Sequence, residues 1–150
     1  MSLLFIGGGE SLGPSVMKKD NTAWAGMDTS WKTITGWIAD PQYPGSAVSG
    51  DGLVVQNGKV GATVEASVPF TGHATLDSDV TLRLMVNNTT VAVTGVAKTC
   101  PEVVTTTVTA SGTYTVATGD VLTLQVQGEW SFASQNPTIA AGAAAYVRIT

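Results

Sequence analysis

Charged residues are scarce in this chain. They make up 12% of its 150 residues, against about 25% in an average soluble domain. Disorder requires low hydrophobicity, whereas 43% of the residues here are hydrophobic. The chain therefore has enough hydrophobic residues to form a core but few charged residues to keep its exterior solvated. We expect part of that exterior to be covered by other subunits.

Basic residues are fewer than acidic ones. Seven Lys and Arg residues stand against eleven Asp and Glu residues, the formal net charge is −4, and the basic residues form no cluster. Because nucleic-acid binding depends on clustered Lys and Arg, we predict no nucleic-acid partner. No apolar run approaches the length of about 20 residues that a membrane-spanning helix needs, so we predict no membrane partner either.

The chain has one cysteine and one histidine. Cys100 has no CxxC or His partner for zinc or redox chemistry, so we interpret it as a buried apolar residue. His73 follows Thr71-Gly72 in an expected loop, and no GxSxG motif surrounds any serine, so a nucleophilic triad is not indicated. We interpret His73 as a solvated loop residue.

The acidic residues form no recognisable motif. Asp77 and Asp79 lack the longer acidic loop of an EF-hand, and we interpret them as a polar turn. We therefore expect no metal, no cofactor and no enzymatic activity. A small glycan hydrolase remains an alternative, because the separation of a carboxylate pair is spatial and not sequential.

From Leu53 onward the sequence alternates between apolar and polar residues, many of them β-branched. This period of two predicts half-buried strands, and Asn87-Asn88 predicts a tight turn between two of them, since Asn tolerates a left-handed backbone. The residues expected to point inward are Ala62, Val64, Ala66, Val68, Phe70, Leu82, Leu84, Val86, Val91, Val93, Leu122, Leu124 and Val126.

Further strands are predicted from "EVVTTTVTA", "GTYTV" and "AAYVRIT". Seven or more short strands without intervening helices predict an all-β protein, an antiparallel jelly-roll β-sandwich. The first 50 residues are less regular, and only "WKTITGWIA" there resembles a strand. We therefore expect an extended N-terminal arm over residues 1–28 and the sandwich over residues 29–150.

The order of features from Gly52 to Thr150 resembles the jelly roll of the tumour necrosis factor and complement globular-head superfamily. The resemblance rests on the segments "GLVVQNGKVGATVEASVPF", "TLRLMVNNTTVAV", "GTYTVATGDVLTLQV" and "AAYVRIT". Its most recognisable feature is the Gly119-Asp120 turn before an alternating strand. The Gly-rich N-terminus and the Thr/Val/Ala-rich sandwich also look like small jelly rolls of tailed-bacteriophage virions. That resemblance implies a homotrimer seated on a capsid or tail.

The N-terminal stretch "LLFIGGG" is interpreted as a docking arm. The segment lacks the basic flank and the apolar core of about 7–15 residues that a secretion signal has, and no Gly-Lys-[Ser/Thr] follows its glycines. It is expected to add as a strand or anchor to a neighbouring subunit or to the shell beneath, hinged on glycines. The alternatives are a frayed terminus or a strand packed on its own sandwich. The docking residues are Leu3, Leu4, Phe5, Ile6, Gly7, Gly8 and Gly9.

Small residues precede the last predicted strand in "NPTIAAGAAAYV". Their lack of bulk lets another subunit approach closely, and a tyrosine is a common interface anchor. We therefore predict a trimer interface at Ala143, Ala144, Ala145 and Tyr146, with a loosely packed loop as the alternative.

Three of the four tryptophans lie in the first quarter of the chain, where packing is the favoured interpretation of them. As an alternative, Trp24 and Trp130 are taken as glycan contacts, since indole rings stack on sugars. The leading hypothesis is a non-enzymatic capsid decoration protein, made in the host cytoplasm, that binds the major capsid protein or another virion protein on the capsid surface. The alternative is a minor tail protein that recognises host glycans.

Overall fold

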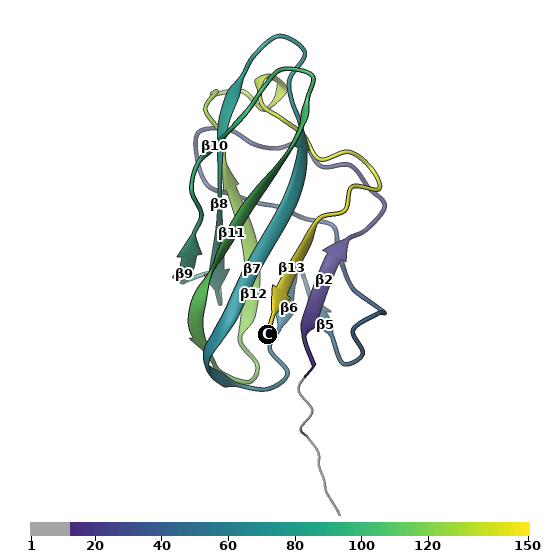
Figure 1. The fold of residues 1–150 in the computed structure, drawn as a ribbon, viewed down its shortest axis with the longest axis vertical. Helices are drawn as coiled ribbons and strands as arrows, with labels where there is room; N and C mark the ends of the chain where they lie inside the picture. Colours follow the sequence, from purple (N-terminus) through teal and green to yellow (C-terminus); the bar gives the residue numbers. More distant parts are fainter. Residues whose placement is uncertain (1–12) are drawn as a thin grey trace, which may run out of the picture.

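The computed structural model describes residues 13–150, which form two antiparallel β-sheets packed on each other (Figure 1). Within those residues the one helical segment is the 3-10 helix η2 (Ala133–Gln135), and none of them forms a helix able to span a membrane. The strands are β2 (Ser15–Lys19), β3 (Lys32–Thr33), β4 (Trp37–Ala39), β5 (Ala47–Ser49), β6 (Gly52–Val54), β7 (Lys59–Thr71), β8 (Ser78–Val86), β9 (Thr90–Thr94), β10 (Lys98–Cys100), β11 (Thr105–Val116), β12 (Val121–Gln127) and β13 (Tyr146–Ile149).

The two sheets have different strand orders. The seven-stranded sheet runs β10-β8-β12-β6-β5, with β9 also paired to β8 and β3 to β12, and the five-stranded sheet runs β11-β7-β13-β2-β4. Figure 1 shows the five-stranded sheet in front, with β13 between β7 and β2. The predicted jelly-roll β-sandwich is confirmed.

The core lies between the sheets, and the residues that alternation placed inward form a large part of it. In β12 the side chains of Leu122, Leu124 and Val126 are fully buried. In β7 the buried set runs from Ala62 to Phe70 at every second residue. Because every second side chain of a strand points to the same face, these runs predicted the buried face correctly.

Val91 is the exception, since its side chain is 43% exposed. The pairing of β8 with β9 shifts between Leu84, which lies opposite Val93, and Met85, which lies opposite Val91. The shift leaves Ala92 as the extra residue of a β-bulge, which turns Val91 to the outer surface while Val93 still packs against the core. The prediction that both valines point inward was therefore wrong for Val91.

Two strand assignments also differ from the sequence-based prediction. The segments "EVVTTTVTA" and "GTYTV" form one strand, β11, which begins only at Thr105 because Val103 has a left-handed backbone (φ 56°). Conversely, "WKTITGWIA" contains two strands in different sheets, β3 and β4, separated by Gly36. Gly36 has φ 85°, and this backbone angle, which glycine adopts readily, lets the chain cross between the sheets.

The expected boundary at residue 28 was wrong for the residues that the structure describes. Strand β2 pairs with both β13 and β4, so it is an interior strand of the five-stranded sheet. Met17 and Met27 are fully buried, which makes this segment part of the core. Strand β2 has only five residues, and neither its sequence nor its burial alternates strictly, so it did not stand out from an irregular context. The proposed docking residues 3–9 lie outside the described residues.

The Asn87-Asn88 turn is confirmed. Both residues have positive φ, 53° and 57°, as the two central residues of a type I′ turn do, and the Thr89 N–H closes the turn on the Val86 carbonyl (3.1 Å). The Asn87 side chain donates to Asp120 Oδ1 (3.0 Å) and accepts the N–H of Val121 (2.9 Å). The Ala117 N–H and the Asn87 amide lower the pKa of the Asp120 carboxyl. These contacts tie the hairpin to the Gly119-Asp120 turn that precedes β12.

Replacing Asn87 with alanine is expected to lower the free energy of unfolding by about 1–3 kcal/mol, because two hydrogen bonds are lost and a left-handed alanine is strained. Asn87→Gly removes the same bonds without the strain and should lose less. Urea denaturation at pH 7 measures both. At a pH below the lowered pKa of Asp120 the difference between parent and Asn87→Ala should shrink, because the carboxylate is then protonated. Equal stability of Asn87→Ala and parent at pH 7 would contradict this role.

Candidate functional site

The outer face of the five-stranded sheet is the candidate functional site. Its register brings side chains from four strands into one row, in which Tyr146 lies between Lys18 and Ser67, and Ser67 lies next to Thr109. In each strand the neighbouring residue, such as Val147, points into the core. The next row consists of Val16, Arg148, Glu65 and Ser111. The fold thus gathers residues that lie far apart in the sequence.

Strand β11 forms one edge of this face and carries no charge. It is an edge strand of the sheet and contains no charged residue and no proline. Its exposed outward positions carry hydroxyl groups, at Thr105, Thr107, Thr109, Ser111, Thr113 and Thr115. Edge strands of soluble proteins are commonly blunted by charges or proline, and a neutral edge is suited to contact with another chain.

Most of the charge on the outer face is paired. Arg148 forms an ion pair with Glu65, and its guanidinium lies 5.3 Å from the centre of the Tyr146 ring. The hydrogen bond to Glu65 raises the pKa of Arg148, so the guanidinium keeps its charge beside the Glu65 carboxylate. Because each charge of such a pair already has a partner, covering the face costs less than burying isolated ions would.

A hollow of about 260 Å³ lies beside these rows. The loop that follows β4 forms one wall and is held by Ser46, whose hydroxyl accepts the N–H of Val16 (2.9 Å) and donates to the Tyr43 carbonyl (2.7 Å). Its lining residues are Val16, Lys18, Asp40, Gln42, Tyr43, Ala144, Ala145, Tyr146 and Arg148. Aromatic rings, aliphatic carbon and a paired arginine are typical of the centre of a protein interface.

The four predicted interface residues do not share one surface. Tyr146 lies half-exposed on the outer face, and Ala144 is exposed beside it. Ala145 is buried in the core, and Ala143 packs against the core. Ala145 therefore offers no surface to another subunit, because the alternation that buries Val147 and Ile149 extends back to it.

Several outer-face residues were not singled out from the sequence. Lys18, Ser67, Thr109 and the Arg148–Glu65 pair lie in the two rows around Tyr146. Alternation did place Glu65 and Ser67 on the polar side of their strand. Which strand lies beside them depends on long-range pairing, which no local pattern contains.

The tryptophans of the first 50 residues mainly pack, as favoured from the sequence. Trp24 forms a bridge with Ile139 and packs on the core. Trp37 is 6% exposed, and its indole N–H donates to the Ile34 carbonyl (2.8 Å). Trp31 lies instead on the surface of the seven-stranded sheet, where Arg83 stacks on its ring at 4.2 Å.

Three loops meet at the upper end of the sandwich in Figure 1 and are called the apical loops, residues 72–77, 101–104 and 128–137. Asp77 joins them, since it accepts the N–H of Glu102 on its carboxylate (3.0 Å) and the indole N–H of Trp130 on its carbonyl (2.9 Å). Val103 and Phe132 are 69% and 68% exposed there. Trp130 is thus half-buried at the apex, and its polar atom is already bonded.

The prediction of a polar turn at Asp77 and Asp79 was wrong for Asp79, which lies in β8 opposite Thr99, whereas Asp77 lies in the loop just before that strand. Asp79 accepts the hydroxyl of Thr99 (2.6 Å), and its N–H donates to Glu129 Oε1 (2.9 Å). Between residues 13 and 150 no three His, Cys, Asp or Glu residues gather as a metal site would require. His73 Nδ1 accepts the N–H of Thr75 (3.0 Å), a local turn contact.

Cys100 lies in the core, as predicted. Its side chain is fully buried, and burial raises the pKa of the thiol to about 11. Because the thiolate is the reactive form, this cysteine is chemically inert at neutral pH.

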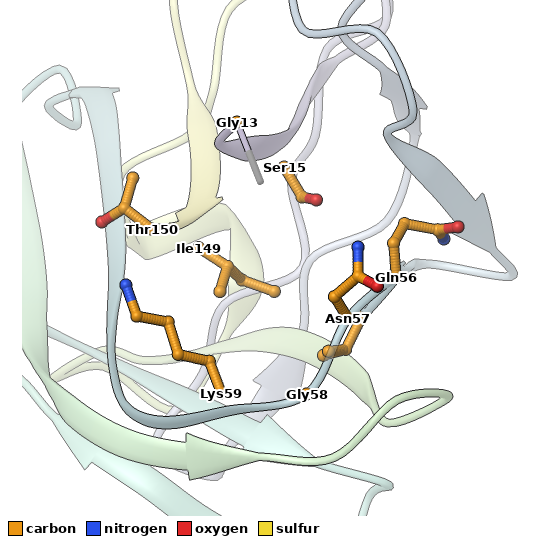
Figure 2. A pocket seen from close by; sticks show the side chains of 9 residues that line it. Gly13, Ser15, Gln56, Asn57, Gly58, Lys59, Ile149 and Thr150 are labelled. Carbon is orange, nitrogen blue, oxygen red and sulfur yellow. The ribbon is translucent and has the colours of Figure 1, made fainter. Parts of the chain in front are cut away.

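A second hollow, called the basal cleft, lies at the opposite end of the sandwich from the apical loops (Figure 2). Its volume is about 220 Å³, and Ile149 and Val55 supply its apolar surface. The remaining lining residues are Gly13, Ser15, Gln56, Asn57, Gly58, Lys59 and Thr150.

Comparison with known proteins connects this fold to the tumour necrosis factor jelly rolls. No protein-family model and no curated protein sequence matches the chain. The structure of Eiger TNF from S. frugiperda superposes with a TM-score of 0.58 at 10% identity, covering 90% of this chain and 89% of that chain. Murine APRIL at pH 5.0 superposes with a TM-score of 0.59 at 11% identity, covering 91% of this chain and 98% of that chain. The chain therefore has the jelly-roll fold of tumour necrosis factor-like proteins.

Proposed function

We propose that this chain is a structural protein of a tailed-bacteriophage virion, a homotrimer that decorates and stabilises the capsid surface. Its function is to bind other proteins. The sandwich forms the trimer, and the N-terminal segment contacts the major capsid protein or another virion protein. The observation that carries the proposal is the outer face of the five-stranded sheet, a broad surface whose two central rows carry only Lys18 and the Arg148–Glu65 pair as charges.

The outer face suits association between copies for a physical reason. Its hydroxyl groups on β11 can exchange water for hydrogen bonds across an interface, and the Arg148–Glu65 pair enters the interface already neutralised. Tyr146 supplies an aromatic anchor beside a hollow of about 260 Å³. Surfaces that must remain in water usually carry more charge than this one.

The docking half of the proposal rests on the sequence "LLFI" at residues 3–6. Burial of one large aliphatic or aromatic side chain contributes about 1.5–3 kcal/mol, so four of them make an effective anchor. The segment concerned is residues 1–12 and not 1–28, because β2 is an interior strand of the sheet.

Deleting residues 2–12 is expected to leave a folded trimer that no longer binds phage particles. Binding is measured by cosedimentation with particles from which the protein has been removed, and folding by circular dichroism and light scattering. A Gly7→Ala, Gly8→Ala, Gly9→Ala chain serves as the matched control, since it keeps the apolar residues. Retained binding after deletion would refute the docking role, and absence of the chain from purified particles by mass spectrometry would refute the virion assignment.

A minor tail protein that recognises host glycans is the second candidate. The observation in its favour is the apical loops, where the indole of Trp130 donates to the Asp77 carbonyl and Phe132 is 68% exposed. Sugar rings stack on aromatic side chains, and their hydroxyl groups donate to nearby hydrogen-bond acceptors.

A glycan array decides between the candidates. If the protein recognises host glycans, the parent chain should bind a defined glycan, and Trp130→Ala should weaken that binding at least tenfold. Trp31→Ala changes a tryptophan on another face and should leave the binding unchanged. Trp24→Ala is a poor probe, because Trp24 packs on the core and its loss would lower stability. Absence of any glycan signal from the parent chain would dismiss this candidate.

A further inference from the structure

The chain contains a single Asn-Gly pair, Asn57-Gly58, in the loop between β6 and β7. Both residues are exposed, and Asn57 lines the basal cleft (Figure 2). An asparagine amide can be attacked by the backbone nitrogen of the next residue, and glycine obstructs that attack least because it has no side chain. The pair therefore combines a reactive sequence with access to water.

A side chain at position 58 would be tightly packed. A Cβ atom there would lie 3.1 Å from the backbone nitrogen of Thr118 and 3.1 Å from the carbonyl oxygen of Val116. Both are backbone atoms, one at the end of β11 and one in the turn before β12, and backbone yields less readily than the end of a side chain. Close packing against this backbone therefore favours a glycine next to Asn57.

The Gly58 N–H donates a hydrogen bond to the Thr118 hydroxyl oxygen (2.8 Å). The nitrogen must lose this proton to attack, and the hydrogen bond retains the proton. Thr118 is exposed, so local opening of the turn breaks the bond at intervals. The reaction should then proceed slowly in the folded protein.

We propose that Asn57 is a site of spontaneous deamidation and that Thr118 restrains the reaction as a positioning residue. The Gly58 nitrogen forms a bond to Asn57 Cγ, the bond from Cγ to the amide nitrogen breaks, and ammonia leaves with the proton. Water then opens the resulting five-membered imide at either carbonyl carbon, giving aspartate or isoaspartate. The reaction needs no oxidant and no cofactor.

The product changes the basal cleft. Each conversion adds one negative charge beside Lys59 and the Ser15 end of β2. Isoaspartate also lengthens the backbone by one carbon immediately before β7, whose Lys59 is paired with Val116. This inference is independent of the proposed virion role, since it concerns the chemistry of the folded chain alone.

The test is incubation of the full chain at mildly alkaline pH, followed by peptide mapping with mass spectrometry. Aspartate and isoaspartate are expected at position 57, while Asn21 and Asn136, which precede Thr and Pro, stay intact. Thr118→Val should accelerate the conversion about two- to tenfold, the equivalent of one hydrogen bond. Thr118→Ser retains the hydroxyl and should react at the parent rate.

Two results would overturn the proposal. In the first, Asn57 stays unmodified in the folded parent over a period in which the urea-denatured chain converts completely. That result would show that Asn57 is not a deamidation site in the folded protein. Equal rates for the parent and Thr118→Val, with both shown by circular dichroism to be folded, would remove the restraining role of Thr118. The chain Asn57→Gln, which should not react, confirms the assignment of the modified peptide.

Discussion

Replacing Ser67 with arginine is expected to abolish self-association of the chain while the sandwich stays folded. Ser67 lies in the central row of the outer face, between Tyr146 and Thr109, so its replacement would add a bulky positive charge, beyond that of Lys18 in the same row, to the proposed interface. Burying an unpaired charge costs about 3–5 kcal/mol, which corresponds to a loss of at least about a hundredfold in each association constant.

Sedimentation equilibrium at micromolar concentration measures this effect. The matched control is Thr81→Arg, which introduces the same side chain on the outward side of the seven-stranded sheet and should assemble like the parent. Assembly of Ser67→Arg with parental affinity would show that the outer face is not the interface. A monomeric parent chain would contradict the homotrimer itself.

Replacing Phe70 with alanine is expected to lower the free energy of unfolding by about 3–5 kcal/mol. Phe70 is fully buried among the largest core side chains, where β7 passes between β11 and β13. Alanine would remove the ring and leave a cavity that the two sheets cannot close without disturbing their pairing. Such a loss is a large fraction of the stability of an ordinary domain.

Urea denaturation followed by tryptophan fluorescence provides the measurement. Phe132→Ala is the matched control, because the same atoms are removed from a side chain that is 68% exposed, and its effect should stay within about 0.5 kcal/mol. If Phe70→Ala does not fold, Phe70→Leu should fold with a smaller loss. Equal stability of parent and Phe70→Ala would contradict the assigned core.

The strands and the main hairpin were predictable because their signals are local. Alternation over "GATVEASVPF" sets which side of β7 is buried, and Asn87-Asn88 accepts the left-handed backbone of a hairpin. The Gly119-Asp120 turn supported the resemblance to a tumour necrosis factor-like jelly roll, and the superposition on Eiger TNF and APRIL confirms that fold.

Other features escaped prediction because their causes are not local. Strand β2 looked like part of an arm, since its five residues acquire a structural role only when β13 and β4 lie on either side. Val91 turns outward because a bulge at Ala92 shifts the register with β8. Ala145, predicted to be at an interface, is buried because it continues the inward set of β13.

The amino-acid sequence by itself determined the class of fold and the chemical composition of the surface. A period of two makes strands, and a low content of charge leaves a neutral exterior whatever the topology. Only the tertiary structure decided which residues share that exterior. Tyr146, Ser67 and Thr109 lie in one row because strands far apart in the sequence pair in a specific register, and one residue of slippage would turn each side chain to the opposite face.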